Sequence, residues 1–149
     1  MKRALFWGII FLALLLESRI SVFGTSPNLT AVIAYYFGLK NGETKGILFG
    51  SLIGLLEDGL SGNILGPNLL GKGLVGFFAS FMSGSFFRWT PLLGMIGIFF
   101  LTALDGITVF LSRTVFELMP TSMLNATLKI IAAAIINSFL GIFIKPRND

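Results

Sequence analysis

The sequence contains no cysteine and no histidine, and only 12% of its 149 residues are charged. Without cysteine the chain can form no disulfide and has no thiol nucleophile, and without histidine it lacks the usual general base. The zinc and haem ligand sets that are built on these two residue types are excluded as well. A membrane-embedded hydrolase with a serine–histidine pair is therefore ruled out, and we expect no catalytic residue, no metal site and no cofactor.

Apolar residues take the place of the missing charges. Hydrophobic residues make up 54% of the chain, and its mean hydropathy is +0.88. This composition leaves too little polar surface to cover a soluble globule of this size. The sequence therefore predicts an all-α integral membrane protein in which residues 1–149 form a single transmembrane domain. No small-residue cleavage pattern follows the first apolar run, so we expect that run to remain as a helix of the mature protein.

Six apolar runs separated by short polar turns predict six transmembrane helices. The runs cover residues 4–23, 28–39, 46–60, 69–87, 91–116 and 126–144. The second run would be about 18 Å long as a helix, against a hydrocarbon core of roughly 30 Å. It must therefore draw in flanking residues, lie where the bilayer is thin, or be buried among other helices.

The basic residues of the loops and termini indicate how the helices are oriented. All seven fall on one side of the predicted bundle: Lys2, Arg3, Lys40, Lys45, Arg88, Lys145 and Arg147. The positive-inside rule makes this side cytoplasmic, so both termini are predicted in the cytoplasm. A four-span alternative would make the second and third runs a re-entrant hairpin, but it would place Lys40 and Lys45 at membrane depth. The net charge of +4 thus reports orientation, and no nucleic-acid partner is expected.

Glycines recur at every fourth position through the second and third runs. The series consists of Gly38, Gly42, Gly46, Gly50 and Gly54, then reaches Asp58, and continues with Gly62 and Gly66. Gly46, Gly50 and Gly54 form two overlapping GxxxG units, which allow another helix backbone to approach closely in lipid. We predict that this face is a contact face, although glycine is also common in membrane helices in general.

Charged side chains within the runs gather near the predicted outer side. Eight of them lie in the outer half of the bilayer or at its outer interface: Glu17, Arg19, Glu57, Asp58, Lys72, Arg113, Glu117 and Lys129. Because a charge at the bilayer centre costs about 2.5 to 3.5 kcal/mol, such side chains should face one another or a hydrated cavity. Arg19 and Glu117 can instead extend to the interface. We predict a bundle that is polar inside at its outer end.

Two acids have more specific expectations. Asp58 should face protein and pair with Lys72 or Lys129, since a tight turn brings Lys72 to a similar depth. Asp105 lies nearer mid-membrane and could supply half of a proton relay. The chain has no histidine and no second acid at this depth, which favours a helix-packing role for Asp105.

Residues 54–66, GLLEDGLSGNILG, resemble the MreD family of bacterial rod shape-determining proteins. The shared pattern is a glycine-spaced helix ending in Gly-Leu-Leu-acid-Asp, a Ser-Gly turn, and a Leu-Gly before the next helix. Gly46 and Gly50 precede it and residues 68–76 follow it. The chain length, the six-span layout and Pro27 after the first span are also similar. The pair Glu17 and Arg19 departs from the more neutral polar position of the family.

The resemblance implies a non-enzymatic scaffold of the cell-wall (peptidoglycan) elongation machinery in the bacterial inner membrane, with a role in cell shape. The partners that it implies are MreC, the actin-like MreB, the glycosyltransferase RodA and a class B penicillin-binding protein, all at or in the lipid bilayer. A homodimer is left open. The family's fold is similar to that of the substrate-binding components of energy-coupling-factor vitamin transporters, which supplies the alternative function. In those components an AxxxA pattern in the first helix docks the transport module, whereas here that helix has only Ala4 and Ala13, which favours MreD.

The candidate site residues fall into two groups. Those expected at a partner or helix-packing surface are Gly46, Gly50, Gly54, Glu57, Asp58, Gly62, Gly66 and Lys72. Those expected as polar residues inside the membrane are Glu17, Asp105, Arg113 and Lys129.

Overall fold

The computed structural model describes residues 2–20, 25–62, 64–83, 88–116 and 122–146. Within these ranges the chain forms six α-helices: α1 (Lys2–Arg19), α2 (Leu29–Asn41), α3 (Glu43–Ser61), α4 (Pro67–Met82), α5 (Pro91–Phe116) and α6 (Met123–Leu140). The prediction of an all-α fold is confirmed, and each helix coincides with one of the six apolar runs. The predicted span ends at residues 23 and 87, together with Glu117 and Arg147, lie outside the described residues.

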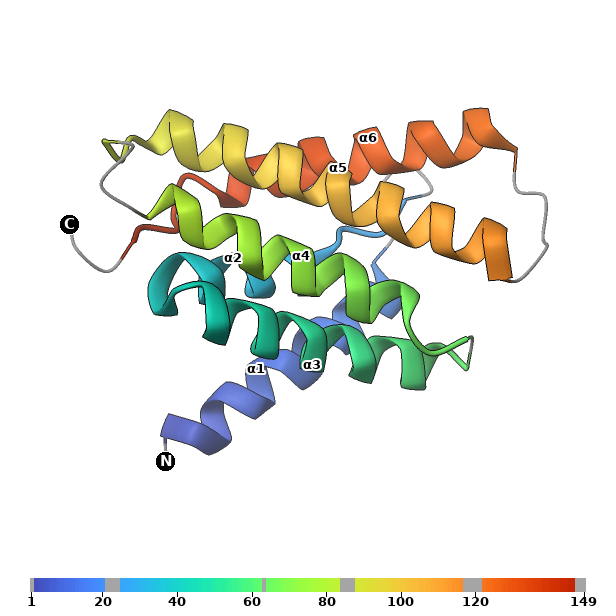
Figure 1. Ribbon diagram of the computed structural model, residues 1–149, viewed down its shortest axis with the longest axis horizontal. Helices are drawn as coiled ribbons and strands as arrows, with labels where there is room; N and C mark the ends of the chain where they lie inside the picture. The colour runs from blue at the N-terminus through green and yellow to red at the C-terminus, as the bar shows by residue number, and fades with distance from the viewer. Residues whose placement is uncertain (1, 21–24, 63, 84–87, 117–121, 147–149) are drawn as a thin grey trace.

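Successive helices run back and forth along the long axis of the molecule (Figure 1). α4 lies in the middle and packs against α2, α3 and α5, while α6 packs against α5. α1 crosses the bundle at an angle and packs mainly on α2. The start of α1, the α2–α3 connection and the end of α6 lie at one end of the molecule. The ends that carry Lys40, Lys45 and Lys145 therefore share the side that the positive-inside rule predicts to be cytoplasmic.

The short helix α2 is buried among its neighbours. It has 13 residues and contacts α1, α3, α4 and α5. Ala34, Tyr35 and Leu39 are 0–1% exposed and form an apolar core with residues of α4 and α5. Of the three explanations for such a short run, the structure thus supports burial inside the bundle. The apolar core fills the half of the bundle around the end of α2, and polar side chains fill the other half.

Two glycines flank the turn between α3 and α4, where the backbone takes positive φ angles. Gly62, the residue after α3, has a φ of +67°, and Gly66, the residue before α4, has a φ of +134°. An added side-chain carbon would meet nothing within 4 Å at either position. Residues with a side chain rarely adopt such backbone angles, whereas glycine does so at little cost. Gly62 and Gly66 therefore take no part in a close helix contact within the described chain, and their expected place on a partner surface stays a prediction.

The distribution of polar and apolar side chains is that of a membrane protein. Large apolar side chains such as Phe100 and Phe139 are 64% and 59% exposed, whereas Asp58 and Lys72 are fully buried. A water-soluble protein keeps such charges outside, because burying them is costly. Two of the described helices, α5 and α6, are also long and apolar enough to cross a bilayer.

Candidate functional site

The glycine face of α3 lies against the backbone of α4. A side-chain carbon at Gly46 would overlap the carbonyl oxygen of Gly76, and one at Gly54 would overlap that of Asn68. Gly50 makes the same close approach to the carbonyl of Lys72, midway between them. The three glycines therefore form an intramolecular helix contact of the kind that small residues allow in membranes. This contact fixes the height and rotation of α4 beside α3.

Asp58 caps the N-terminus of α4. Its carboxylate accepts hydrogen bonds from the backbone N–H groups of Gly66 (2.9 Å), Asn68 (3.2 Å) and Leu69 (3.1 Å), and from Asn68 Nδ2 (2.9 Å). Asp58 thus faces protein, as expected. The predicted ion pair with Lys72 or Lys129 is wrong, because the unpaired N–H groups and the positive dipole end of α4 already satisfy the carboxylate.

Lys72 instead pairs with two other acids. Its Nζ lies 2.9 Å from Glu57 Oε2 and 3.3 Å from Asp105 Oδ2. It also donates to Asn68 Oδ1, one turn earlier in α4, at 3.1 Å. The fully buried ammonium therefore joins α3, α4 and α5 at one point. Gly71 leaves room for this arrangement, because a side-chain carbon there would overlap Asp105 Oδ1.

Asp105 extends the network to α2 and α6. Asn28, the N-cap of α2, donates a hydrogen bond from Nδ2 to Asp105 Oδ2. Asn137 of α6 donates to the carbonyl oxygen of Asn28 at 2.8 Å and to Thr102 Oγ1 at 3.2 Å. Asp105 thus connects α4, α5 and the start of α2, which agrees with the helix-packing expectation. The premise that no second acid lies at its depth is wrong, since Lys72 bridges Asp105 to Glu57.

Thr30 connects α1 to this network. Its Oγ1 lies 3.0 Å from Glu17 Oε2 and 2.7 Å from Glu57 Oε2, at donor–acceptor distances for both. A hydroxyl carries one proton and can donate to only one carboxylate at a time. Glu17 and Glu57 are therefore held on either side of a single hydroxyl, and this polar contact ties the end of α1 to α2 and α3.

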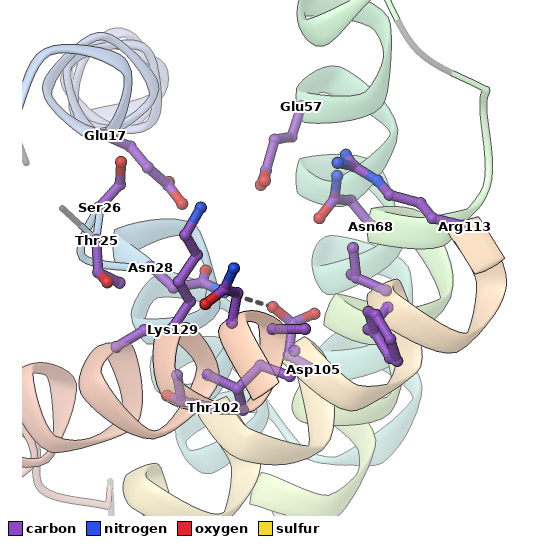
Figure 2. Close-up of a pocket in the computed structure, with 17 residues that line it drawn as sticks. Glu17, Thr25, Ser26, Asn28, Glu57, Asn68, Thr102, Asp105, Arg113 and Lys129 are labelled. Carbon is purple, nitrogen blue, oxygen red and sulfur yellow. Dashed lines mark hydrogen bonds between the residues drawn. The ribbon is translucent and has the colours of Figure 1, made fainter. Parts of the chain in front are cut away.

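A cavity of about 410 Å³ opens beside the network. Figure 2 shows Glu17, Glu57, Asp105, Arg113 and Lys129 around it. These five predicted residues are brought together as expected, at the polar end of the bundle. Asp58 and the three glycines of α3 do not line it, and Lys72 lies behind its wall, bonded to Glu57 and Asp105. Among the described residues, no group of three histidine, cysteine, aspartate or glutamate side chains could hold a metal ion.

Sequence reasoning did not select several polar residues that complete the network. They are Asn28, Thr30, Asn68, Thr102 and Asn137. The signal that could have found them is an amide or hydroxyl side chain within or beside an apolar run, since such groups hydrogen-bond between helices in membranes.

The family of the chain follows from a comparison with protein-family models. The model described as rod shape-determining protein MreD matches residues 3–143. The chain belongs to the MreD family. Comparison with curated proteins gives no match, and neither does comparison with solved structures. The match places the protein in a family of membrane proteins that determine rod shape.

The structure shows what the residues of the segment that resembles MreD do in the fold. Residues 54–66 contain the glycine nearest to Asn68, the acid that pairs with Lys72, the acid that caps α4, and the two glycines with positive φ. This MreD segment therefore determines how α3 ends and how α4 is attached to it.

Proposed function

We propose that the protein is a non-enzymatic scaffold of the cell-wall elongation machinery that binds MreC and related membrane partners through helix contacts. The observation that carries this proposal is the MreD match over residues 3–143. The structure supports it because the buried charges hold helices together: Asp58 caps α4, and Lys72 joins α3, α4 and α5. Such a rigid bundle suits a protein that presents its outer surface to partners.

The proposed setting is the bacterial inner membrane, which a single domain of six helices crosses with both termini in the cytoplasm. The alternating directions of the helices support this topology, as does the common end for the start of α1 and the end of α6 (Figure 1). The buried position of α2 accounts for a helix of 13 residues among longer ones.

The partner surface is not the glycine face of α3. Gly46, Gly50 and Gly54 are buried against α4 in the same chain, so a partner helix could reach them only by displacing α4. We propose that MreC binds the apolar outer faces of the bundle instead. A homodimer would have to use the same outer faces.

One observation favours the alternative function, the substrate-binding component of an energy-coupling-factor transporter. The cavity of about 410 Å³ lies within the size range of small-molecule sites. A fold similar to that of those components remains part of this alternative.

The two functions can be separated by identifying what copurifies with the protein. A tagged, full-length chain is extracted from its native membranes in a mild uncharged detergent, and both proteins and small molecules in the eluate are identified by mass spectrometry. The scaffold proposal expects MreC at a level well above that in a mock purification. Recovery of ATPase and transmembrane components of a transporter, without MreC, would contradict it and support the alternative.

A further inference from the structure

The hydroxyl of Thr30 is surrounded by more acceptor oxygens than its one proton can serve. Thr30 Oγ1 lies 2.7 Å from Glu57 Oε2, 3.0 Å from Glu17 Oε2 and 3.2 Å from Asn28 Oδ1. The Asn28 oxygen already accepts the backbone N–H of Ala31 at 3.0 Å, so it does not depend on Thr30. The two carboxyl groups do compete for the proton. One of them faces the hydroxyl oxygen with no hydrogen between them, unless that carboxyl group carries a proton itself.

The contacts show which of the two acids lacks a donor. Glu57 Oε2 lies 2.9 Å from the ammonium of Lys72 as well as beside the hydroxyl, so Glu57 is an acceptor for both groups. Glu17 Oε2 has the backbone N–H of Thr30 at 3.4 Å, which is longer than an ordinary hydrogen bond. A proton on Glu17 completes the chain, because Glu17 then donates to Thr30 and Thr30 donates to Glu57.

The other charges near Glu17 do not supply this donor. The charged groups on the elements around it are Arg19 of α1, Glu57 of α3, Lys72 of α4, Asp105 and Arg113 of α5, and Lys129 of α6. Among the described residues, no salt bridge joins Glu17 to any of these bases. The buried ammonium of Lys72 is already shared by two acids. A third carboxylate at this point would be repelled by Glu57, whereas a neutral carboxyl group is not.

Helix α1 depends on this polar contact more than the other helices would. It crosses the bundle at an angle and packs mainly on α2 (Figure 1), and Ile10 and Ala13 are the buried residues among its described side chains. A second cavity, of about 210 Å³, lies between α1 and α3, and Glu17 and Glu57 line both cavities. Because lipid covers an apolar helix as well as protein does, polar contacts weigh heavily in whether α1 stays docked.

We propose that a proton bound by Glu17 latches α1 onto α2 and α3, and that loss of this proton releases the end of α1. Figure 2 shows the carboxyl groups of Glu17 and Glu57 directed toward one another across the larger cavity, through which protons can reach Glu17. Release of α1 would join the two cavities. Since the docked form binds one more proton than the released form, docking is favoured at low pH. It is lost as the pH rises, by at most about tenfold per pH unit.

The first measurement detects the proton itself. Infrared spectra of the purified full-length protein in an uncharged detergent are recorded for the wild-type chain, Glu17→Gln and Glu43→Gln. Glutamine at position 17 can donate to Thr30 as the protonated acid does, and Glu43 is an exposed acid at the start of α3, at the opposite end of the bundle. We expect Glu17→Gln to lose a carbonyl band of a protonated carboxylic acid that Glu43→Gln keeps.

The second measurement follows the position of α1. Because the chain has no cysteine, nitroxide labels can be attached to Leu12→Cys on α1 and Leu52→Cys on α3, which are both exposed positions. Pulsed electron paramagnetic resonance gives the distance between the labels from about pH 5 to about pH 9, a range in which lysine and arginine keep their charge. The released population should grow with pH in the labelled parent and in Glu43→Gln. In Glu17→Gln it should stay at its low-pH value.

Four outcomes would overturn the proposal. They are a wild-type spectrum without the protonated band, a band that Glu17→Gln keeps in full, a label distance that does not change with pH in the labelled parent, and an equal pH response in Glu17→Gln. The first and third need no substitution at Glu17, so they apply even if that variant fails to fold. Release of α1 at low pH by Lys129→Gln would also contradict the proton, because it would identify an ion pair between Lys129 and Glu17 in its place.

Discussion

Replacing Lys72 by methionine tests the buried charge network most severely. The variant keeps a long side chain but removes the ammonium that lies 2.9 Å from Glu57 and 3.3 Å from Asp105. Lys72 is fully buried and Asp105 is 1% exposed, so the substitution removes a charge from inside the bundle. Breaking a buried pair by removing one member costs about 3 to 5 kcal/mol. For a chain of this size, each kcal/mol corresponds to about 2 to 4 °C in melting temperature, so we expect a loss of roughly 6 to 20 °C.

The double variant Lys72→Met with Asp105→Asn separates charge imbalance from lost packing. Removing the second charge should restore part of the loss, because one of the two acids that form ion pairs with the ammonium is then neutral as well. The coupling between the two substitutions should be about 1 to 3 kcal/mol, as for residues in one ion-pair network.

The assay is reversible unfolding in mixed detergent micelles, followed by tryptophan fluorescence. Lys45→Met serves as the control, because this exposed lysine should change stability by less than about 0.5 kcal/mol. If Lys72→Met is as stable as Lys45→Met, or if the double variant shows no recovery, the buried ion pairs do not stabilise the bundle as described.

Three further results are expected. Gly54→Leu should prevent α3 from packing on α4 and abolish folded protein in size-exclusion chromatography, whereas Gly59→Leu on the open side of α3 should be tolerated; equal yields would remove the role of the glycine face. Asp58→Ala should lose about 1 to 2 kcal/mol more stability than Asp58→Asn in the unfolding assay, because asparagine keeps one capping oxygen; indistinguishable stabilities would contradict the cap. In intact cells a membrane-impermeant thiol reagent should label Ser122→Cys and not Asn41→Cys, and the reverse pattern would refute the six-span topology.

The sequence allowed the helices and their order to be predicted because apolar runs directly determine which segments are buried in lipid or protein. The glycine face could be predicted as well, because glycines four residues apart leave one side of a helix without side chains. This is true whichever element packs against that side. What the spacing could not show is that α4 of the same chain occupies this face. That depends on the whole bundle.

The partners of the acids were harder to predict. Glu57 and Asp58 are adjacent, so they point about 100° apart around α3, and a small rotation decides which of them meets Lys72. The rotation is determined by the contact of Gly54 with α4 and by the turn with two positive-φ glycines. Asp105 reaches the same lysine from α5, a contact between residues that are 33 positions apart. No local pattern encodes such a contact.

Restoration of rod shape is the measurement that tests the central claim most directly. Cells of the source organism from which the chromosomal copy is deleted are supplied with the protein or a variant at matched membrane levels, and cell length and width are measured by microscopy. The wild-type chain and Lys45→Met should restore rods, whereas Lys72→Met should leave rounded cells. Rods restored equally by Lys72→Met would contradict a shape function that depends on the buried charge network, and rounded cells with the wild-type chain would contradict the shape function itself.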